Sequence, residues 1–311
     1  MNILVTGGAG FIASHVVDTY IQAGHDVTVI DDLSTGKREN LNPAATFREG
    51  DIRDADVVGR LLTGGTFDVL NHHAAQMDVR RSVADPVHDA SINVLGALTM
   101  FEAAAHSGVK RVIFSSSGGA IYGEQDYFPA DEAHPTRPMS PYGVAKLTTE
   151  QYLHYYKVVH GVESVSLRYA NVYGPRQNPE GEAGVVAIFT KKMLRGEQPV
   201  INGDGAQTRD YVYVGDVVRA NVLALTSRGS AVFNIGTGTE TSVNAVFGEL
   251  KLITGSGCAE AHREAKKGEQ LRSVLSSAKI RTELGWLPGV RLREGLRDTV
   301  EYFRKQTPHG I

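Results

Sequence analysis

The sequence predicts an α/β fold: a doubly wound parallel sheet in the first half, followed by a smaller C-terminal α/β lobe. Short apolar runs rich in β-branched residues recur through the first half, and stretches of helical period separate them. A glycine-rich turn directly follows the first run, and after residue 170 the pattern loosens into Gly- and Pro-rich connections. Strands that alternate with helices indicate a parallel sheet with helices on both faces.

Several runs have the composition of strands buried in such a sheet. They are NILVT, DVTVID, FDVLNHH, RVIFSSS and ESVSLRY, at residues 2–6, 26–31, 67–73, 111–117 and 163–169. Between them, the stretches 88–107 and 141–160 are long enough for helices of several turns. We therefore place a first domain at residues 1–170.

The second half contains helical stretches joined by long loops. The helical stretches are 184–195, 214–227, 242–254 and 276–304. Loops as long as NVYGPRQNPEGEAG and VINGDGAQTRDY are uncommon in compact domains unless they bind something. We expect residues 171–311 to form mainly a substrate-binding domain, with 205–228 packing back on the first domain.

Charge and composition argue against several classes of function. The 311 residues carry a formal charge of -3, which provides no basic field for nucleic acid or an anionic membrane. No apolar stretch approaches the roughly 18 residues of a membrane helix, and MNILVTGG lacks the regions of a signal peptide. The single cysteine, Cys258, cannot form an internal disulfide, and no Cys/His cluster has zinc-ligand spacing. We expect a cytoplasmic protein without a bound metal.

The stretch ILVTGGAGFIASH places glycines between the first strand and a helix. Gly8, Gly10 and Ala13 fit the pattern G-x-G-x-x-G/A, and Gly7 and Gly10 also have the spacing G-x-x-G. Glycines at this junction let the backbone turn tightly and approach a pyrophosphate at the positive end of the helix. The motif predicts a Rossmann-type dinucleotide site in the first domain.

The acidic end of the second strand indicates which dinucleotide binds. Asp31 lies where an acidic side chain can bind the adenosine ribose hydroxyls. Asp31 and Asp32 would repel a 2′-phosphate, whereas Lys37 and Arg38 leave NADP as an alternative. We favour NAD because of this negative charge. The strand, the helix and the acid together argue against a glycine turn that binds nothing.

The polar side chains at the end of the run RVIFSSS are candidates for a catalytic site. Ser115, Ser116 and Ser117 leave the sheet at its carboxyl edge, where open α/β sheets bind ligands. In SPYGVAKL, Tyr142 and Lys146 are one helical turn apart and share a helix face. A lysine charge beside a phenol favours the phenolate, so we expect the pKa of Tyr142 to lie below its usual value of about 10. The alternatives are an ordinary helix surface and a serine that caps a strand end.

These motifs, with RYANVYGPRQ and RDYVYVGDVVRA, resemble the extended short-chain dehydrogenase/reductase superfamily. Within it the chain is most similar to bacterial UDP-glucose 4-epimerases, from Met1 to about residue 305. The resemblance implies bound NAD and catalysis by Tyr142, Lys146 and Ser117. Tyr142 would remove the C4 hydroxyl proton of a UDP-sugar while C4 gives up a hydride, and Ser117 would hydrogen-bond that oxygen. A 4-keto sugar would then turn over and be reduced on its other face.

The resemblance also implies two sets of binding residues. Those that contact NAD are Gly7, Gly10, Phe11, Ile12, Asp31, Asp32, Asp51, Ile52, Ala74, Ala75, Gln76, Asn93, Ser115, Tyr142, Lys146, Tyr169 and Val172. Those that contact the UDP-sugar are Ser117, Tyr142, Asn171, Val185, Val186, Ala187, Asn202, Gln207, Arg209, Lys266 and Glu269. Remote contacts of this kind would anchor the UDP while the hexose turns. By the same resemblance, 88–107 and 141–160 pair with their copies as the four-helix bundle of a homodimer.

Some positions depart from the family pattern. Many relatives carry Arg-Pro-Gly-Asp where this chain has KKGE at 266–269, and lysine lacks the bidentate fork of arginine. Relatives often place the catalytic hydroxyl at the position of Gly118, so we select Ser117 instead, with Ser116 as the alternative. Ser273 lies where some epimerases carry a bulky residue, which makes UDP-GlcNAc a candidate second substrate.

Other functions of the superfamily are alternatives. In 4,6-dehydratases an Asp-Glu pair follows the catalytic hydroxyl, but this chain has Gly118, Gly119 and Ala120 there. UDP-glucuronate 4-epimerases, UDP-glucuronate decarboxylases and other NDP-sugar epimerases stay open, because one carboxylate contact in the sugar pocket decides between them. A non-catalytic NAD-binding sensor would lack Tyr142, Lys146 or the serine, and all are present.

Overall fold

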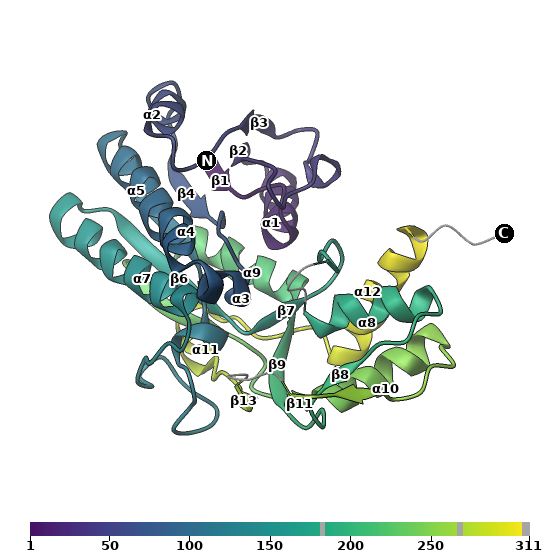
Figure 1. Ribbon diagram of the computed structural model, residues 1–311. Helices are drawn as coiled ribbons and strands as arrows, with labels where there is room; N and C mark the ends of the chain where they lie inside the picture. Colours follow the sequence, from purple (N-terminus) through teal and green to yellow (C-terminus); the bar gives the residue numbers. More distant parts are fainter. Residues whose placement is uncertain (181–183, 266–269, 307–311) are drawn as a thin grey trace.

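A seven-stranded parallel sheet forms the centre of the larger lobe, with six strands from the first half of the chain and one from the second (Figure 1). The computed structural model describes residues 1–180, 184–265 and 270–306. The strands are β1 (Asn2–Thr6), β2 (Asp26–Asp31), β3 (Thr46–Glu49), β4 (Val69–His72), β5 (Arg111–Ser117), β6 (Glu163–Tyr169) and β10 (Ala231–Ile235). Their order is β10-β6-β5-β4-β1-β2-β3, and it reverses direction between β1 and β4. The carboxyl edge at such a reversal is where doubly wound sheets bind ligands.

The predicted strands are all present, and β4 is shorter than the run from which it was predicted. β3 and β10 were not predicted, for different reasons. β3 (TFRE) is an edge strand with three of its four residues exposed, so it has no apolar run. β10 (AVFNI) lies far beyond residue 170 in the sequence, and its pairing with β6 depends on tertiary packing.

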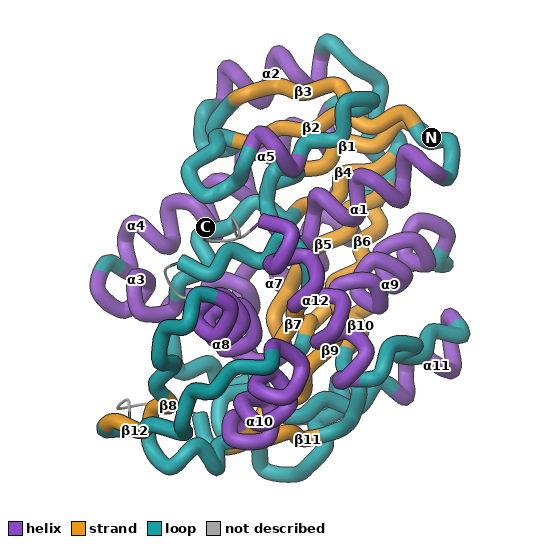
Figure 2. Tube along the Cα trace, turned by 90° about the vertical axis from the view of Figure 1, so that its right-hand side faces the viewer, coloured by secondary structure: helices purple, strands orange, loops and turns teal. Residues whose placement is uncertain are grey.

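Helices cover both faces of this sheet (Figure 2). On one face lie α1 (Phe11–Gln22), α9 (Val214–Thr226) and α11 (Ala278–Leu284). On the other face lie α2 (Ala55–Thr63), α5 (Ala97–His106) and α7 (Pro141–His160). The doubly wound α/β fold predicted from the sequence is confirmed.

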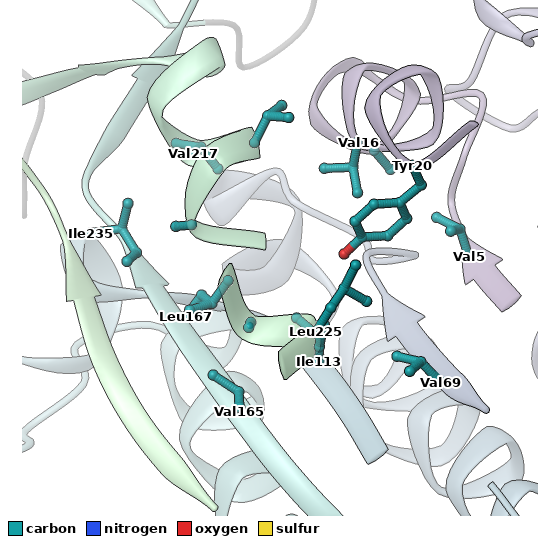
Figure 3. Packing of buried hydrophobic residues seen from close by; sticks show 14 of the residues in the cluster. Val5, Val16, Tyr20, Val69, Ile113, Val165, Leu167, Val217, Leu225 and Ile235 are labelled. Carbon is teal, nitrogen blue, oxygen red and sulfur yellow. The ribbon is translucent and has the colours of Figure 1, made fainter. Parts of the chain in front are cut away.

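The core between the sheet and the face covered by α1 and α9 holds the glycine turn in place (Figure 3). Val5, Ile113 and Leu167 come from different strands, and none has exposed surface. Tyr20 of α1 is equally buried, and its hydroxyl donates to the Asn221 carbonyl of α9 at 3.2 Å. Burial of each such side chain contributes roughly 1.5–3 kcal/mol relative to exposure. This packing fixes α1 against the sheet, and with it the turn that precedes α1.

The segment between β4 and β5 is helical, with a change of pitch in its middle. It consists of α3 (Val79–Ala84), α4 (Pro86–Ala90), the π-helical turn η2 (Ser91–Gly96) and α5. Asp85 caps α4 by accepting from the His88 N–H at 2.9 Å. Short π-helical turns often mark functional sites, and Asn93 lies within this one. The remaining short helices of this half are η1 (Arg38–Asn40) and α6 (Gly118–Ile121).

A smaller mixed sheet and a group of helices form the second lobe (Figure 1). β9 (Thr208–Tyr213) pairs with β7 (Asn171–Tyr173), β11 (Glu240–Ser242) and β13 (Arg272–Ser273). Separately, β8 (Ile201–Asn202) pairs with β12 (His262–Arg263). α8 (Val185–Leu194), α10 (Val243–Thr254) and α12 (Leu292–Gln306) pack around one apolar cluster. The chain enters this lobe from β6 through β7.

The helical stretch predicted over 276–304 is interrupted between α11 and α12. Gly285 takes a left-handed conformation, with φ +69°, which ends α11. Pro288 then disfavours a continuing helix. Trp286 turns inward instead, and its indole N–H donates to the Asp216 carbonyl at 2.9 Å. The helical period of the sequence on either side concealed this break.

Candidate active site

The glycine turn after β1 forms a cradle bounded by backbone atoms. Gly7 has φ +71°, and a Cβ at this position would lie 2.8 Å from the backbone nitrogen of Ala74. The Gly10 N–H donates to the Gly7 carbonyl at 2.9 Å and closes the turn. Among the described residues no side chain caps the start of α1, so its first N–H groups are available to an anion. A side chain at Gly7 would fill this cradle.

Asp31 supports the turn from the end of β2. Its buried carboxylate accepts from the Ala9 N–H at 3.0 Å and from the Leu33 N–H at 2.8 Å. Burial raises the pKa of this carboxyl, and the two backbone hydrogen bonds oppose that rise. Asn40 also holds the turn, because its amide donates to the Ala9 carbonyl at 3.0 Å. Asp31 therefore orders the glycine turn, a role that its sequence position did not indicate.

The cations that left NADP as an alternative are paired with carboxylates. Lys37 Nζ lies 3.7 Å from Glu39 Oε1, and the Arg38 guanidinium pairs with Glu49. Two aspartates at the end of β2 add negative charge beside them. This arrangement favours a dinucleotide without a 2′-phosphate. The cradle, the uncapped helix start and the acid at the strand end therefore fit NAD.

A buried polar cluster orders the loop that follows β4. Asn93 Oδ1 accepts from the Gln76 N–H at 2.9 Å, and Asn93 Nδ2 donates to the Gln76 carbonyl at 2.8 Å. Asp89 Oδ1 accepts from Asn93 Nδ2 and from Gln76 Nε2, each at 2.9 Å. At the start of the loop, the Ala74 N–H donates to the Thr6 hydroxyl at 3.0 Å. Asp89 was not predicted, since an aspartate within a helical stretch has no motif to mark it.

Tyr142, Lys146 and Ser117 meet at the carboxyl edge of β5. The phenol of Tyr142 is hydrogen-bonded to Ser117, the last residue of β5. Lys146 is buried, donates to the Ser115 carbonyl at 2.8 Å, and has its Nζ 5.7 Å from the centroid of the Tyr142 ring. Ser140 is the N-cap of α7, which places Tyr142 in the first turn, over the edge of the sheet.

The expectation that Lys146 lowers the pKa of Tyr142 is wrong in this structure. Enclosure of the phenol raises the pKa of Tyr142 to about 12, although the residue is partly exposed. The hydrogen bond with Ser117 opposes this rise, and the charge of Asp89 adds to the rise. Burial also lowers the pKa of Lys146 to about 8, against the raising effects of Asp89 and Glu150. The lysine ammonium is directed at a backbone carbonyl, and desolvation outweighs its charge. A further positive charge beside Tyr142 is needed to favour its phenolate near neutral pH.

The structure separates the two candidate serines. Successive side chains of a strand point to opposite faces of the sheet, so the hydroxyls of Ser116 and Ser117 diverge. Ser116 is buried and donates to Glu150 Oε1 at 2.6 Å. The guanidinium of Arg168 donates to both oxygens of the same carboxylate, at 3.0 and 2.6 Å. Ser117, selected from the sequence, is the serine bonded to Tyr142.

The other residues implied for the cofactor are spread along the same edge. Phe11 and Ile12 lie in the first turn of α1, Asp32 after β2, Ala75 after β4, Tyr169 at the end of β6 and Val172 in β7. Asp51 is bound by Arg53, whose hydrogen bonds lower the pKa of the carboxyl. Ile52 is buried beside Gly96. The Tyr169 hydroxyl accepts from the Asn221 amide at 2.9 Å, so this phenol is already engaged on the α9 face.

The residues implied for the UDP-sugar line the second lobe. Asn171 is exposed in β7, while Val186 and Ala187 are buried in the first turn of α8, after Val185. Because the Val186 and Ala187 side chains pack inward, a ligand at this turn would meet backbone groups. The structure does not bring these residues into contact with Tyr142 by any hydrogen bond within the described ranges.

A second group lies around β8 and the start of β9. Gln207 Nε2 donates to the Asn202 carbonyl at 3.1 Å, and Asn202 Oδ1 accepts from Arg263 Nε at 2.6 Å. Arg209 follows on β9. Lys266 and Glu269 lie outside the described residues. Arg263 is a cation that the sequence patterns did not single out, since its nearness to Asn202 depends on the pairing of β8 with β12.

Within residues 1–180, 184–265 and 270–306, no group of three His, Cys, Asp or Glu residues has the arrangement of a metal site. In the same ranges, every helix is too short or too polar to cross a membrane.

Comparison with known proteins places the chain beside sugar-nucleotide epimerases. The model of a family described as "NAD dependent epimerase/dehydratase family" matches residues 3–236. The UDP-glucose 4-epimerase of Thermotoga maritima, in a structure with UDP-glucose, is 52% identical, with a TM-score of 0.97 over 98% of this chain and 99% of that chain. The Thermus thermophilus UDP-glucose 4-epimerase, in complex with NAD, is 43% identical, with a TM-score of 0.94 over 99% of this chain and 100% of that chain.

A third similar structure has a different sugar in its name. It is the UDP-N-acetylglucosamine 4-epimerase of Methanobrevibacter ruminantium, in complex with UDP-N-acetylmuramic acid. It is 36% identical to this chain, with a TM-score of 0.93 over 98% of this chain and 99% of that chain. The similarity to all three extends over both lobes.

Proposed function

The chain belongs to the NAD dependent epimerase/dehydratase family, and we propose that it interconverts UDP-glucose and UDP-galactose at C4, with NAD as its cofactor. One observation carries the proposal. The hydrogen bond between Ser117 and Tyr142, with Lys146 one turn away, lies at the same edge of the sheet as the glycine turn. The near full-length similarity to epimerases of UDP-sugars supports this substrate class.

Residues of the first lobe would hold the dinucleotide at this edge. The cradle of Gly7 and Gly10 and the first N–H groups of α1 would bind its pyrophosphate, and the acids after β2 would face its adenosine ribose. When bound, NAD⁺ supplies a hydride acceptor and a positive charge near the reacting carbon. Tyr142 requires such a charge, because enclosure raises the pKa of its phenol to about 12.

Tyr142 and Ser117 would handle the proton of the C4 hydroxyl. The Tyr142 phenolate accepts this proton as C4 is oxidised, and the phenol returns it when the carbonyl is reduced on the other face. The Ser117 hydroxyl donates to the same sugar oxygen and holds it against Tyr142. Lys146, bound to the Ser115 carbonyl, keeps an ammonium beside both groups while it is protonated. The product then differs from the substrate only in configuration at C4.

Epimerisation requires an uneven grip on the substrate. We propose that Asn171, Asn202, Gln207 and Arg209 hold the uridine diphosphate, with Lys266 and Glu269 as further candidates. A guanidinium such as that of Arg209 can bind two phosphate oxygens at once. Binding energy from these remote contacts would retain the substrate while the hexose turns over.

A 4,6-dehydratase is a poor alternative, for a steric as well as a chemical reason. Gly118 stands where a dehydratase would need an acid, and a side chain there would require Leu275 to shift, because a Cβ would lie 2.4 Å from one of its terminal methyl groups. A UDP-glucuronate 4-epimerase uses the same chemistry at C4 and is the alternative that the experiment below must distinguish. A non-catalytic NAD-binding sensor has no use for a phenol bonded to a strand-end serine.

UDP-N-acetylglucosamine is a second candidate substrate. Ser273 is a small buried residue in β13, opposite Arg209 in the strand register. A small side chain here leaves more room beside a proposed substrate residue than a bulky one would. The similarity to an epimerase of UDP-N-acetylglucosamine supports testing this sugar.

We further propose a cytoplasmic homodimer joined through the helices of 88–107 and 141–160. Apolar side chains are exposed along these helices and the segment before them, among them Val87 (78%), Leu95 (59%) and Val158 (69%). Exposed apolar surface on paired helices is typical of an interface. A sedimentation profile at micromolar protein should show a dimer, and monomer alone would contradict the assembly. The single cysteine fits a reducing compartment.

Proton NMR of the purified protein with UDP-galactose tests the proposed function. The anomeric and H4 signals of UDP-glucose should grow to an equilibrium mixture. UDP-N-acetylglucosamine and UDP-glucuronate, run in parallel with and without added NAD⁺, test the second substrate and the alternative. Conversion of UDP-glucuronate alone would replace our substrate, and no conversion of any of the sugars would contradict epimerisation.

A further inference from the structure

A buried ion pair lies directly behind the reactive residues, and no step above uses it. Glu150 of α7 and Arg168 of β6 expose only 4% and 7% of their side chains. The two charges form a fork, with Arg168 Nε donating to Glu150 Oε1 at 3.0 Å and a terminal guanidinium nitrogen donating to Oε2 at 2.6 Å. Bidentate geometry of this kind fixes orientation as well as distance.

The ion pair is the centre of a network that joins several elements. The Ser116 hydroxyl donates to Glu150 Oε1 at 2.6 Å, which links β5 to α7. The free terminal nitrogen of Arg168 donates to the Tyr122 hydroxyl at 2.9 Å. Tyr122 in turn donates to Asn234 Oδ1 of β10 at 2.7 Å. α7 is thereby bonded, through one carboxylate, to the ends of adjacent strands.

The position of Glu150 couples it to the reactive groups. It follows Lys146 by one helical turn and Tyr142 by two, on the buried side of α7. Its hydroxyl partner, Ser116, immediately precedes Ser117 in β5. A displacement of Glu150 therefore moves the helix that carries the phenol relative to the strand that carries its serine.

A second ion pair, which joins β5 to β6, shows what an unspecialised pair looks like. Arg111 and Glu163 stand opposite each other at the amino ends of β5 and β6, with a nitrogen–oxygen distance of 2.6 Å. Their side chains are 13% and 32% exposed. A fully buried charged pair costs more desolvation free energy than a partly exposed pair such as Arg111–Glu163. Apolar residues of similar volume often stabilise a fold as well as a buried pair, or better. A pair buried this deeply beside a reactive site therefore points to a role in positioning.

We propose that Glu150 is a positioning residue of the active site: by binding Ser116 and Arg168 it fixes α7 against β5 and β6, so that Tyr142 and Lys146 stay within reach of Ser117. The kinetic part of this inference rests on the proposed function.

The Glu150 carboxylate also belongs to the charges around Lys146. The titratable groups there are Asp89 of α4, His72 at the end of β4, His73 directly after it, Tyr142 and Glu150. Burial lowers the pKa of both histidines to about 3, so they stay neutral between pH 6 and 10 by a wide margin.

Three variants separate the charge of Glu150 from its reach. Glu150→Gln keeps the length and removes the charge, Glu150→Asp keeps the charge and shortens the reach, and Glu163→Gln is the matched control at the far end of the same strands. A displacement of about 1 Å at a reacting centre costs on the order of 100-fold in rate. We expect both Glu150 variants to lower kcat at least about tenfold with KM for UDP-galactose changed less than about threefold. Glu163→Gln should retain kcat within about twofold.

The pH profile distinguishes positioning of the site from general loss of structure. Lys146 is protonated below its pKa of about 8, and the Glu150 carboxylate raises that value. In Glu150→Gln the activity should therefore fall off at lower pH than in the wild type. Glu150→Asp and Glu163→Gln should keep the wild-type limb, the former at reduced kcat.

A measurement without turnover keeps the inference separate from the proposed function. The 13Cε resonance of Lys146 can be assigned by its loss in Lys146→Arg. In Glu150→Gln this resonance should titrate at lower pH than in the wild type, and in Glu163→Gln it should titrate at the wild-type pH. If the wild type converts no sugar, the proposed function fails while this titration still decides the inference. An unchanged Lys146 titration in Glu150→Gln, or equal losses of kcat in Glu150→Gln and Glu163→Gln, would overturn the inference.

Glu150→Gln leaves a buried arginine without its counter-charge and can unfold the chain. Arg168→Lys is the second route, because lysine keeps the charge and cannot form the fork. We expect this variant to fold, as judged by its circular dichroism, and to lose about three- to tenfold in kcat at constant KM. Wild-type kcat in folded Arg168→Lys would also count against the inference.

Discussion

Ser116 and Ser117 are neighbours in one strand, and the structure gives them opposite surroundings. Ser117 is the last residue of β5, and its hydroxyl is bonded to the phenol of Tyr142, a residue that is partly exposed to solvent. Ser116 is bonded to Glu150, whose charge Arg168 neutralises in the interior. On one side the partner has to change protonation during the proposed reaction, and on the other side the partner is held in place by the fork of Arg168. A serine at a sheet edge is thus reactive or supporting according to its partner, and strand alternation decides which partner it meets.

The largest effect is expected at the partner of Ser117. Tyr142→Phe removes the group that takes the C4 hydroxyl proton, so turnover of UDP-galactose should fall roughly 10²–10⁴-fold. The substrate contacts that we propose lie elsewhere, so the dissociation constant for UDP-glucose should stay within about threefold. Initial rates by NMR and affinity by calorimetry check both values. Turnover close to that of the wild type would remove Tyr142 from the mechanism.

Ser117→Ala tests the serine of the reactive side. Loss of one hydrogen bond to the oxygen that carries developing charge typically costs about 10²–10³-fold in kcat. The Tyr142 pKa should rise as well, because the Ser117 hydrogen bond lowers it in this structure. A kcat within about twofold of the wild type would show that this hydroxyl is dispensable, contrary to the assigned proton-handling role.

The pH dependence of kcat tests the reactive side of the site through Lys146. Burial lowers its pKa to about 8 from 10.5, so the charged form that we assign to catalysis is lost as pH rises through about 8. The effect on stability has the opposite sign. Between pH 8 and 10.5 the unfolded chain binds more protons at Lys146 than the folded chain does, so the contribution of Lys146 to the free energy of unfolding increases with pH. We therefore expect kcat to decline above pH 8 while the Lys146 contribution to folding does not. The alkaline limb should disappear in Lys146→Arg if that variant retains measurable activity.

Ser116→Ala should have the smallest effect. Glu150 keeps both of its bonds to Arg168, so only one hydrogen bond to a carboxylate is lost, at about 1.5–3 kcal/mol of stability. We expect kcat within about fivefold of the wild type, and a lower midpoint of urea unfolding. If Ser116→Ala loses as much turnover as Ser117→Ala, the division of roles between the two serines is incorrect.

Much of the fold was predictable because it depends on local patterns. The strands of the first half other than β3, the glycine turn and the helix capped by Ser140 each have a signal within a few residues. The pairing of Tyr142, Lys146 and Ser117 was predictable because parallel strands end at one edge. β10 and the break at Gly285 were not, since tertiary contacts decide them.

The electrostatics of the site were the least predictable part. A charge beside a phenol suggested a lowered pKa, but the sequence does not show that burial outweighs that charge or that Asp89 lies near. The Glu150–Arg168 pair joins residues 18 positions apart on a helix and a strand, with no motif that relates them. Local patterns thus located the reactive groups, and three-dimensional packing set their ionisation and support.

The most direct test of the account follows the hydrogen at C4. UDP-galactose deuterated at C4 is converted in ordinary water, and the UDP-glucose product is examined by proton NMR and mass spectrometry. A hydride that leaves C4 and returns to it does not exchange with water, whereas the hydroxyl proton passed through Tyr142 does. We predict UDP-glucose that retains the deuterium at C4. Product that carries hydrogen from water at C4 would contradict the proposed mechanism.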